Sequence, residues 1–370
     1  MSDQTRARDY HRRQLRLRLL GLALTAVYLV AVLASGVARD LRDALAHLTP
    51  HWWLALPLML AVLGGVYRLL TLPLAWLSGF WLPRRFGLLH QSLARWAWDA
   101  VKASLIGAVL GLAMAELVYL LLRTTAWWWL AGAAALLAGS ALVTLVAPIW
   151  LVPLFYRLTP LADDGGLAAR LERLAARAGA PVLGVWVADQ SRRSRTANAA
   201  VTGLGRTRRV ILFDTLVHEF TADEVESVLA HELGHHVHGD IWRGLLVQGG
   251  LTVAAFAGAD LALRAGADAL GLAGPGDLAG LPLLGLVLLG AGLVGLPVGN
   301  GWSRHVERQA DAFALRTTGN PAAFIGAMER LGALNLAERD PHPLVELLLY
   351  SHPSLGRRIA HARLFLRPAG

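Results

Sequence analysis

Residues 103–122 read ASLIGAVLGLAMAELVYLLL, twenty residues with a single charged side chain, Glu116. A helix of about 20 residues is long enough to cross the roughly 30 Å hydrocarbon core of a bilayer. Similar apolar runs, one of them interrupted by Arg68, occupy residues 19–38, 52–82, much of 124–156, 244–263 and 278–302. We therefore expect a mainly α-helical protein whose polytopic bundle has about six transmembrane spans.

The composition agrees with a bilayer as the main solvent. Of the 370 residues, 55% are hydrophobic and only 16% are charged. Cysteine is absent, which excludes disulfides, thiolate ligands and a cysteine nucleophile, so a metal site can use only His, Asp and Glu. The net charge of +9 comes from arginines that cluster beside the apolar runs. This placement indicates contact with a lipid surface and no nucleic-acid partner.

The arginine clusters also predict orientation. Six arginines precede the first span, at positions 6, 8, 12, 13, 16 and 18, and three follow the second, at 84, 85 and 95. Because Lys and Arg concentrate in cytoplasmic loops, both termini and the polar segments 157–243 and 304–370 are expected in the cytoplasm. The arginine bias favours a bacterial plasma membrane. We divide the chain into a membrane domain, 1–156, with four spans, and a second domain, 157–370, with the last two.

The second domain has the sequence pattern of a small α+β unit. Leu167, Leu171 and Leu174 recur at helical spacing, and short β-branched runs follow at 182–187, 197–202 and 210–213. Thr221 with Glu224 three residues later is a capping-box pattern, so a helix is expected to begin there and to run through His235.

That helix carries the motif His231-Glu232-Leu233-Gly234-His235. On a helix, imidazoles at positions i and i+4 share one face and can bind one ion, and Glu232 lies beside them. Zinc suits this site, since neutral imidazole is a preferred ligand and a catalytic ion retains a water molecule. Zinc lowers the pKa of its water toward about 7, and Glu232 is the expected general base.

A catalytic zinc ion takes a third protein ligand, and Glu307 is the candidate. Glu307 and Asp311 are four residues apart, so on a helix both face the same way. Glu307 could then bind the ion while Asp311 orients a liganding imidazole. The competing interpretation is a solvated acidic face between arginines, which leaves the motif without its third ligand.

These residues resemble the CAAX prenyl protease type I family of polytopic membrane zinc metallopeptidases and its bacterial relatives. The similar blocks occur in the same order: Asn198-Ala199, residues 209–216 (RVILFDTL), the His231–His235 motif, residues 303–314 around Glu307, and Ser351-His352-Pro353 with Arg358. The resemblance is strong over residues 180–370. It is weaker over the N-terminal spans, where six expected crossings compare with seven in that family.

The resemblance implies a role for each matching residue. It places one zinc ion on His231, His235 and Glu307, the general base on Glu232, and an orienting acid at Asp311. It further implies that Asn198 holds the substrate backbone and that His352 and Arg358 act as catalytic residues that stabilise the developing oxyanion.

The expected function is therefore zinc-dependent endoproteolysis of membrane-associated proteins, either prenylated or misfolded. The alternative is a catalytically silent membrane scaffold or a metal-handling membrane protein that uses the same His/Glu cluster. An intact Glu232 argues against a silent site, and the motif lies in a polar segment instead of at the middle of a span, where transporters place such residues. The sequence leaves the substrate and the oligomeric state open.

Overall fold

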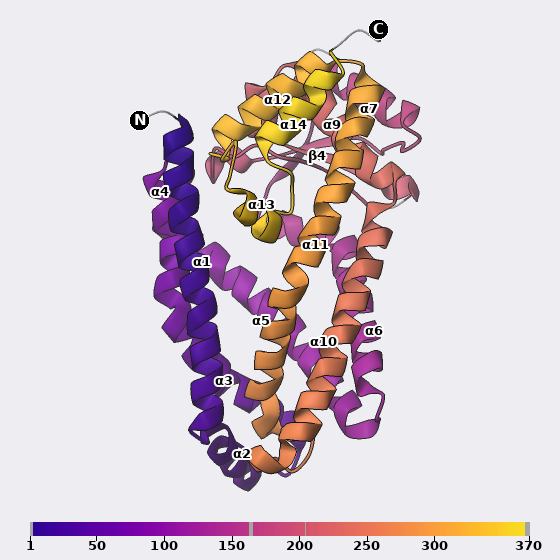
Figure 1. The fold of residues 1–370 in the computed structure, drawn as a ribbon. Helices are drawn as coiled ribbons and strands as arrows, with labels where there is room; N and C mark the ends of the chain where they lie inside the picture. Colours follow the sequence, from indigo (N-terminus) through magenta and orange to yellow (C-terminus); the bar gives the residue numbers. More distant parts are fainter. Residues whose placement is uncertain (1–2, 163–165, 204, 367–370) are drawn as a thin grey trace.

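Six long helices that are apolar enough to cross a membrane dominate the computed structural model, which describes residues 3–162, 166–203 and 205–366. They run side by side along the long axis of the molecule, below a polar domain at one end (Figure 1). Their bounds are α1 Asp3–Ala34, α3 Trp52–Trp76, α5 Leu93–Thr124, α6 Trp128–Val146, α10 Asp240–Leu270 and α11 Leu281–Thr318. This arrangement confirms the expected polytopic helical fold.

Short elements extend two of these helices. α3 continues through a π-helical turn at Leu77–Trp81 into α4, Leu82–Arg85. α6 continues through a π-helical turn at Ala147–Leu151 and a 3₁₀ turn at Val152–Leu154. Both extensions carry the chain from the bundle toward the polar domain (Figure 1).

The expected end of the first span, at residue 38, was wrong. α1 stops at Ala34, and Gly36 adopts a left-handed conformation with φ 79° before α2 begins at Val37. A residue with a Cβ is disfavoured at such a φ, so this glycine breaks the helix at a position that hydrophobicity alone does not mark. α2, Val37–Leu48, lies across the end of the bundle remote from the polar domain (Figure 1).

The outer surface of the bundle is apolar, as lipid contact requires. Leu246 and Val294 are each 78% exposed, and Leu69 is 71% exposed. Inside, aromatic packing joins the helices, and Trp128 Nε1 donates a hydrogen bond of 2.7 Å to Asp260 Oδ1 between α6 and α10. The pattern is that of a bundle with buried polar pairs and a lipid-facing exterior.

The polar domain is built on a four-stranded sheet with the order β1-β2-β4-β3. β2 and β4 are parallel, and the other two pairings are antiparallel. The strands are β1 Leu158–Pro160, β2 Val185–Ala188, β3 Ala199–Thr202 and β4 Arg209–Phe213. β1 was not predicted, because three residues ending in proline give no alternating pattern. β3 is an edge strand, paired with β4 on one side only.

Helices cover this sheet and form the core of the domain. α9 lies at its centre, and Leu229 and Leu233 on α9 are fully buried with Leu212 of β4 and Leu216 of α8. The Thr221 hydroxyl accepts from the Glu224 N–H and the Glu224 carboxylate accepts from the Thr221 N–H, which confirms the expected capping box. The helices are α7 Leu167–Arg177, α8 Asp214–Glu219, α9 Ala222–Val237, α12 Pro321–Leu334, α13 Pro343–Leu349 and α14 Leu355–Leu364.

Candidate active site

The site forms where α9 packs against α11. α11 is one continuous helix of 38 residues, so the last membrane span carries Glu307 and Asp311 directly into the polar domain. Gly234 allows the two helices to approach closely, because a Cβ at this position would lie 3.1 Å from the Ala310 Cα and 3.3 Å from Phe313. A glycine inside the motif thus brings Glu307 within reach of the two histidines.

Three possible ligand groups converge between these helices. His231 Nε2 lies 3.2 Å from His235 Nε2 and 3.4 Å from Glu307 Oε2, and His235 Nε2 lies 3.5 Å from Glu307 Oε1. Around a tetrahedral zinc ion with bonds near 2.05 Å, adjacent ligand atoms are about 3.3 Å apart. The spacing therefore matches the edges of a tetrahedral coordination shell.

The donor chemistry also fits a metal. Glu307 Oε2 is buried and accepts no hydrogen bond from any described residue, an arrangement that is costly unless a cation binds there. Among the described residues, His231, His235 and Glu307 are the one group of three or more such side chains whose ligand atoms converge, all within 4.8 Å. Two imidazoles and one carboxylate form a ligand set that catalytic zinc uses.

Carboxylates fix the orientation of both imidazoles. His231 Nδ1 lies 2.9 Å from Asp311 Oδ1, and His235 Nδ1 lies 2.9 Å from Asp240 Oδ2. Each contact places the proton on Nδ1 and leaves the Nε2 lone pair free for a metal. Asp311 was expected from its helical spacing to Glu307, whereas Asp240 was not predicted. The available signal was its position, since Asp240 begins α10 directly after the turn at Gly239 that ends the motif helix.

The electrostatics of the pocket favour a bound cation. Burial alone would lower the pKa of His231, but the neighbouring Asp311 and Glu307 carboxylates outweigh it and raise this pKa to about 9. A proton and a metal ion compete for the same imidazole, so the raised pKa reports the negative potential created by the two carboxylates. The pocket therefore attracts positive charge at the position where the three ligand groups meet.

Glu232 lies beside the cluster and lines the adjoining cleft. Burial raises the pKa of its carboxyl, while the two neighbouring histidines act in the opposite direction. A general base works best when its pKa approaches the working pH, and burial moves Glu232 that way. The placement agrees with the base role expected from the motif.

The three remaining expected residues also line this cleft. His352 is 59% exposed, and its Nε2 lies 3.2 Å from Glu307 Oε1. Arg358 makes a bidentate pair with Asp311, at 2.9 and 2.6 Å, so its guanidinium is held beside His231. Asn198 is exposed immediately before the edge strand β3, and its side chain accepts a hydrogen bond from the Ala199 N–H. Five of the expected site residues therefore line one cleft, and the other three, His235, Glu307 and Asp311, contact His231 at its wall.

The cleft has a volume of about 530 Å³. Its walls come from the chain before β3, from α9, from α12, and from the segment that leads to α14. One further wall residue, His11, comes from the first turns of the membrane helix α1. The dimensions suit an extended peptide that passes between Asn198 and the His/Glu cluster.

Comparison with known proteins identifies the class. Residues 162–365 match the model of peptidase family M48, and residues 2–157 match the N-terminal region of CAAX prenyl proteases, which is described as having five membrane helices. Over 2–157 the described part of the chain has four long apolar helices and the short α2. Fold and site together define a membrane zinc metalloendopeptidase. The chain belongs to peptidase family M48.

The similar proteins agree with this assignment. The chain is 28% identical over 348 residues to an uncharacterized metalloprotease, YhfN, of Bacillus subtilis, covering 93% of this chain and 81% of that protein. It is 34% identical over 181 residues to CAAX prenyl protease 1 of Saccharomyces cerevisiae, covering 48% and 39%. The crystal structure of S. mikatae Ste24p superimposes with a TM-score of 0.80 and 26% identity, over 97% of this chain and 88% of that one.

These findings decide between the two functional alternatives. The family resemblance expected from the sequence is confirmed, and with it a metallopeptidase that resides in a membrane. Nothing in the comparisons supports a silent scaffold or a metal-handling protein. The family implies a metal, typically zinc, and the His/Glu cluster is the group of described residues that fits it.

Proposed function

We propose that the chain hydrolyses peptide bonds of membrane-associated proteins in the cleft beside α9, with Glu232 as the general base. The observation that carries this proposal is the convergence of His231, His235 and Glu307 next to the buried carboxyl of Glu232. Zinc held by these three residues would supply a Lewis acid and lower the pKa of a water molecule. Glu232 takes a proton from the attacking water and passes it to the leaving amine.

In this proposal His352 and Arg358 stabilise the negative charge that develops on the scissile carbonyl oxygen. His352 is exposed in the cleft, and its Nδ1 is 2.8 Å from the Ser351 hydroxyl, which orients the ring. Its Nε2 is then directed toward the cluster and can donate to the developing oxyanion. Arg358 is held by Asp311, so it contributes positive charge from a fixed position. Asn198, directly before the edge strand β3, holds the substrate backbone in an extended form.

The mechanism is tested by three variants and a generic quenched peptide. Glu232→Gln is expected to retain zinc and to lose at least about 100-fold in kcat, the range for a general base. His235→Ala is expected to lose both zinc and activity. Glu219→Gln removes an exposed carboxylate on the neighbouring α8 and is the matched control. A Glu232→Gln protein that cleaves as fast as wild type refutes the proposed base.

The substrate class is tested separately. We place one cleavable segment either in a soluble protein or at the end of a transmembrane helix, both in nanodiscs with the enzyme. We expect the tethered form to be cleaved faster at equal bulk concentration, because the enzyme and the tethered substrate share one bilayer. Adding a prenyl group or unfolding the tethered domain then distinguishes prenylated from misfolded substrates. Equal rates for the soluble and tethered forms contradict a membrane-associated substrate.

We also propose that the cleft faces the cytoplasm, from the arginine clusters that flank α1 and α3. Because the chain has no cysteine, a thiol reagent that labels a single introduced cysteine shows on which side of the membrane that position lies. His218→Cys on α8 and His47→Cys on α2 are matched, since both histidines are exposed. α8 packs on β4 in the polar domain, whereas α2 lies at the opposite end of the bundle (Figure 1). In intact cells, an impermeant thiol reagent should label position 47 and spare position 218. The reverse pattern contradicts the orientation.

A further inference from the structure

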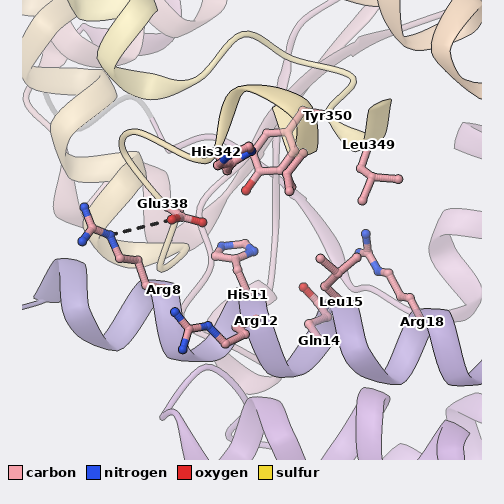
Figure 2. A pocket seen from close by; sticks show the side chains of 11 residues that line it. Arg8, His11, Arg12, Gln14, Leu15, Arg18, Glu338, His342, Leu349 and Tyr350 are labelled. Carbon is pink, nitrogen blue, oxygen red and sulfur yellow. Dashed lines mark ion pairs between the residues drawn. The ribbon is translucent and has the colours of Figure 1, made fainter. Parts of the chain in front are cut away.

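A second cavity, of about 240 Å³, lies beside the catalytic cleft between α1 and the segment 336–350, which we call the C-terminal strap. Figure 2 shows α1 as its floor and the strap as its roof. His11, Glu338 and Tyr350 line both this cavity and the catalytic cleft. A peptide in the cleft can therefore reach the α1 cavity past these three side chains.

The walls of the α1 cavity are fixed by polar contacts. His11 Nε2 donates to the Leu336 carbonyl at 2.9 Å, and the Arg339 N–H donates to Gln4 Oε1 at 3.2 Å. Leu336 is buried with φ 48°, the single non-glycine residue with positive φ among those described. On its other side the strap is held by Arg304 of α11, which donates to the Tyr350 carbonyl at 2.6 Å. The cavity is thus a built part of the fold.

The cavity is cationic. It is lined by Arg8, Arg12 and Arg18 against one carboxylate, Glu338, which gives a net charge of +2 with neutral histidines (three minus one). Arg8 faces Glu338 at 3.8 Å, as drawn in Figure 2. No described carboxylate lies within 4.0 Å of the Arg12 or Arg18 guanidinium. Arg12 and Arg18, which line the α1 cavity, therefore form no salt bridge with a described carboxylate.

A neutral hydrogen-bond donor lies next to these cations. Burial raises the pKa of Tyr350 to about 12, with Glu338 adding to the shift, so the phenol keeps its proton at neutral pH. Arg18 and Tyr350 line the same cavity, and Tyr350 also lines the catalytic cleft. In Figure 2 the Arg18 side chain rises from α1 toward the strap. Guanidinium and phenol donors together are suited to a carboxylate.

We propose that Arg18 forms an anion subsite of the catalytic cleft that takes a carboxylate of the bound substrate, and that Arg12, on the other side of His11 in Figure 2, adds positive charge to the same cavity. The carboxylate is either the C-terminus of the peptide or an acidic side chain. A substrate group is favoured over a lipid phosphate because the cavity shares three lining residues with the cleft. This inference rests on the proposed function, since it assigns specificity to the same peptidase site.

The test uses quenched peptides that differ in one charge, with the enzyme in phosphatidylcholine nanodiscs. One pair ends in a carboxylate or an amide, and further pairs carry Glu or Gln at single positions around the scissile bond. At one position the acid form is expected to have about fivefold higher kcat/KM, since a solvent-accessible ion pair contributes about 1 kcal/mol or less. The position identifies the source as the C-terminus or a side chain. The preference should weaken with added salt.

Variants of the arginines then show which residues cause the preference for the acidic peptide. In Arg12→Gln/Arg18→Gln the acid-to-neutral ratio should fall to about 1, and Arg18→Glu should reverse it in favour of a peptide with lysine at that position. Arg16→Gln removes an exposed arginine of α1 that lines neither cavity, and it should leave the ratio and the activity unchanged. The charge reversal keeps the test valid even if one variant is poorly folded.

Each remaining outcome is decisive. The inference is overturned if the double variant keeps the wild-type ratio, or if the variants change activity only when anionic lipid is added, which would assign the arginines to a phospholipid. If wild type cleaves the acid and neutral peptides equally, this inference fails while the proposed function stands. If zinc-loaded wild type cleaves no peptide, the proposed function itself fails.

Discussion

Removing the Asp240 carboxylate should weaken metal binding although Asp240 is not itself a proposed ligand. Asp240 Oδ2 lies 2.9 Å from His235 Nδ1, and its other oxygen lies 3.1 Å from Arg243. Loss of such an orienting carboxylate typically costs 10- to 100-fold in metal affinity, or about 1.4 to 2.7 kcal/mol. We expect the loss of zinc affinity in Asp240→Ala to lie in this range. Asp240→Asn should lose less zinc affinity, because the amide oxygen can still accept a hydrogen bond from His235 Nδ1.

The assay is zinc competition with a chromophoric chelator in detergent. Asp268→Asn, an exposed carboxylate on the same helix α10, is the matched control and should retain wild-type affinity. Arg243→Gln removes the other partner of Asp240 and separates loss of the ion pair from loss of the imidazole contact. An Asp240→Ala protein whose zinc affinity stays within about twofold of wild type refutes this reasoning.

Three further outcomes follow from the site. Burial raises the pKa of Glu232 above 4.5, the ordinary pKa of a Glu carboxyl. The acidic limb of the pH profile of kcat/KM should therefore have its midpoint above pH 4.5, and a midpoint below this value contradicts the role of Glu232 as the base. Burial lowers the pKa of His236, whose Nε2 donates to the Val201 carbonyl. Below about pH 6.5 unfolding therefore takes up a proton at this residue, and stability decreases as the pH is lowered. His236→Asn should therefore reduce the dependence of Tm on pH between about pH 5 and 7. If the dependence is the same as in wild type, His236 is not its cause. Gly234→Ala should cost about 1 to 3 kcal/mol, because its Cβ meets the α11 backbone at 3.1 Å. Chemical denaturation measures this loss, and an unchanged midpoint contradicts the close approach.

Local patterns in the sequence were sufficient to predict the helical bundle and the helix that carries the motif. Six apolar runs correspond to six long helices, and the Thr221 capping box begins α9 as expected. These features depend on residues close together in the chain, where period and capping chemistry are directly readable. The division of the chain at residue 156 stays a prediction.

Features that depend on turn geometry or on contacts between distant segments could not be predicted in this way. Asp240 reaches His235 because of a left-handed turn at Gly239, with φ 66°, that a residue count does not reveal. The continuity of α11 through Pro297 was also hidden, since proline usually ends a helix. The docking of His11 on Leu336 joins residues 325 positions apart. No periodicity records such a pairing, so the role of α1 in the cleft appeared only in the structure.

The most direct test of the account is X-ray absorption at the zinc edge, measured on the purified chain and on Glu307→Ala. The account predicts about one zinc per wild-type chain with two imidazoles and oxygen ligands at about 2.0 to 2.2 Å, and a lost carboxylate or lost metal in Glu307→Ala. A wild-type chain without zinc, or a coordination shell unchanged by Glu307→Ala, would contradict the assignment of His231, His235 and Glu307 as the metal site.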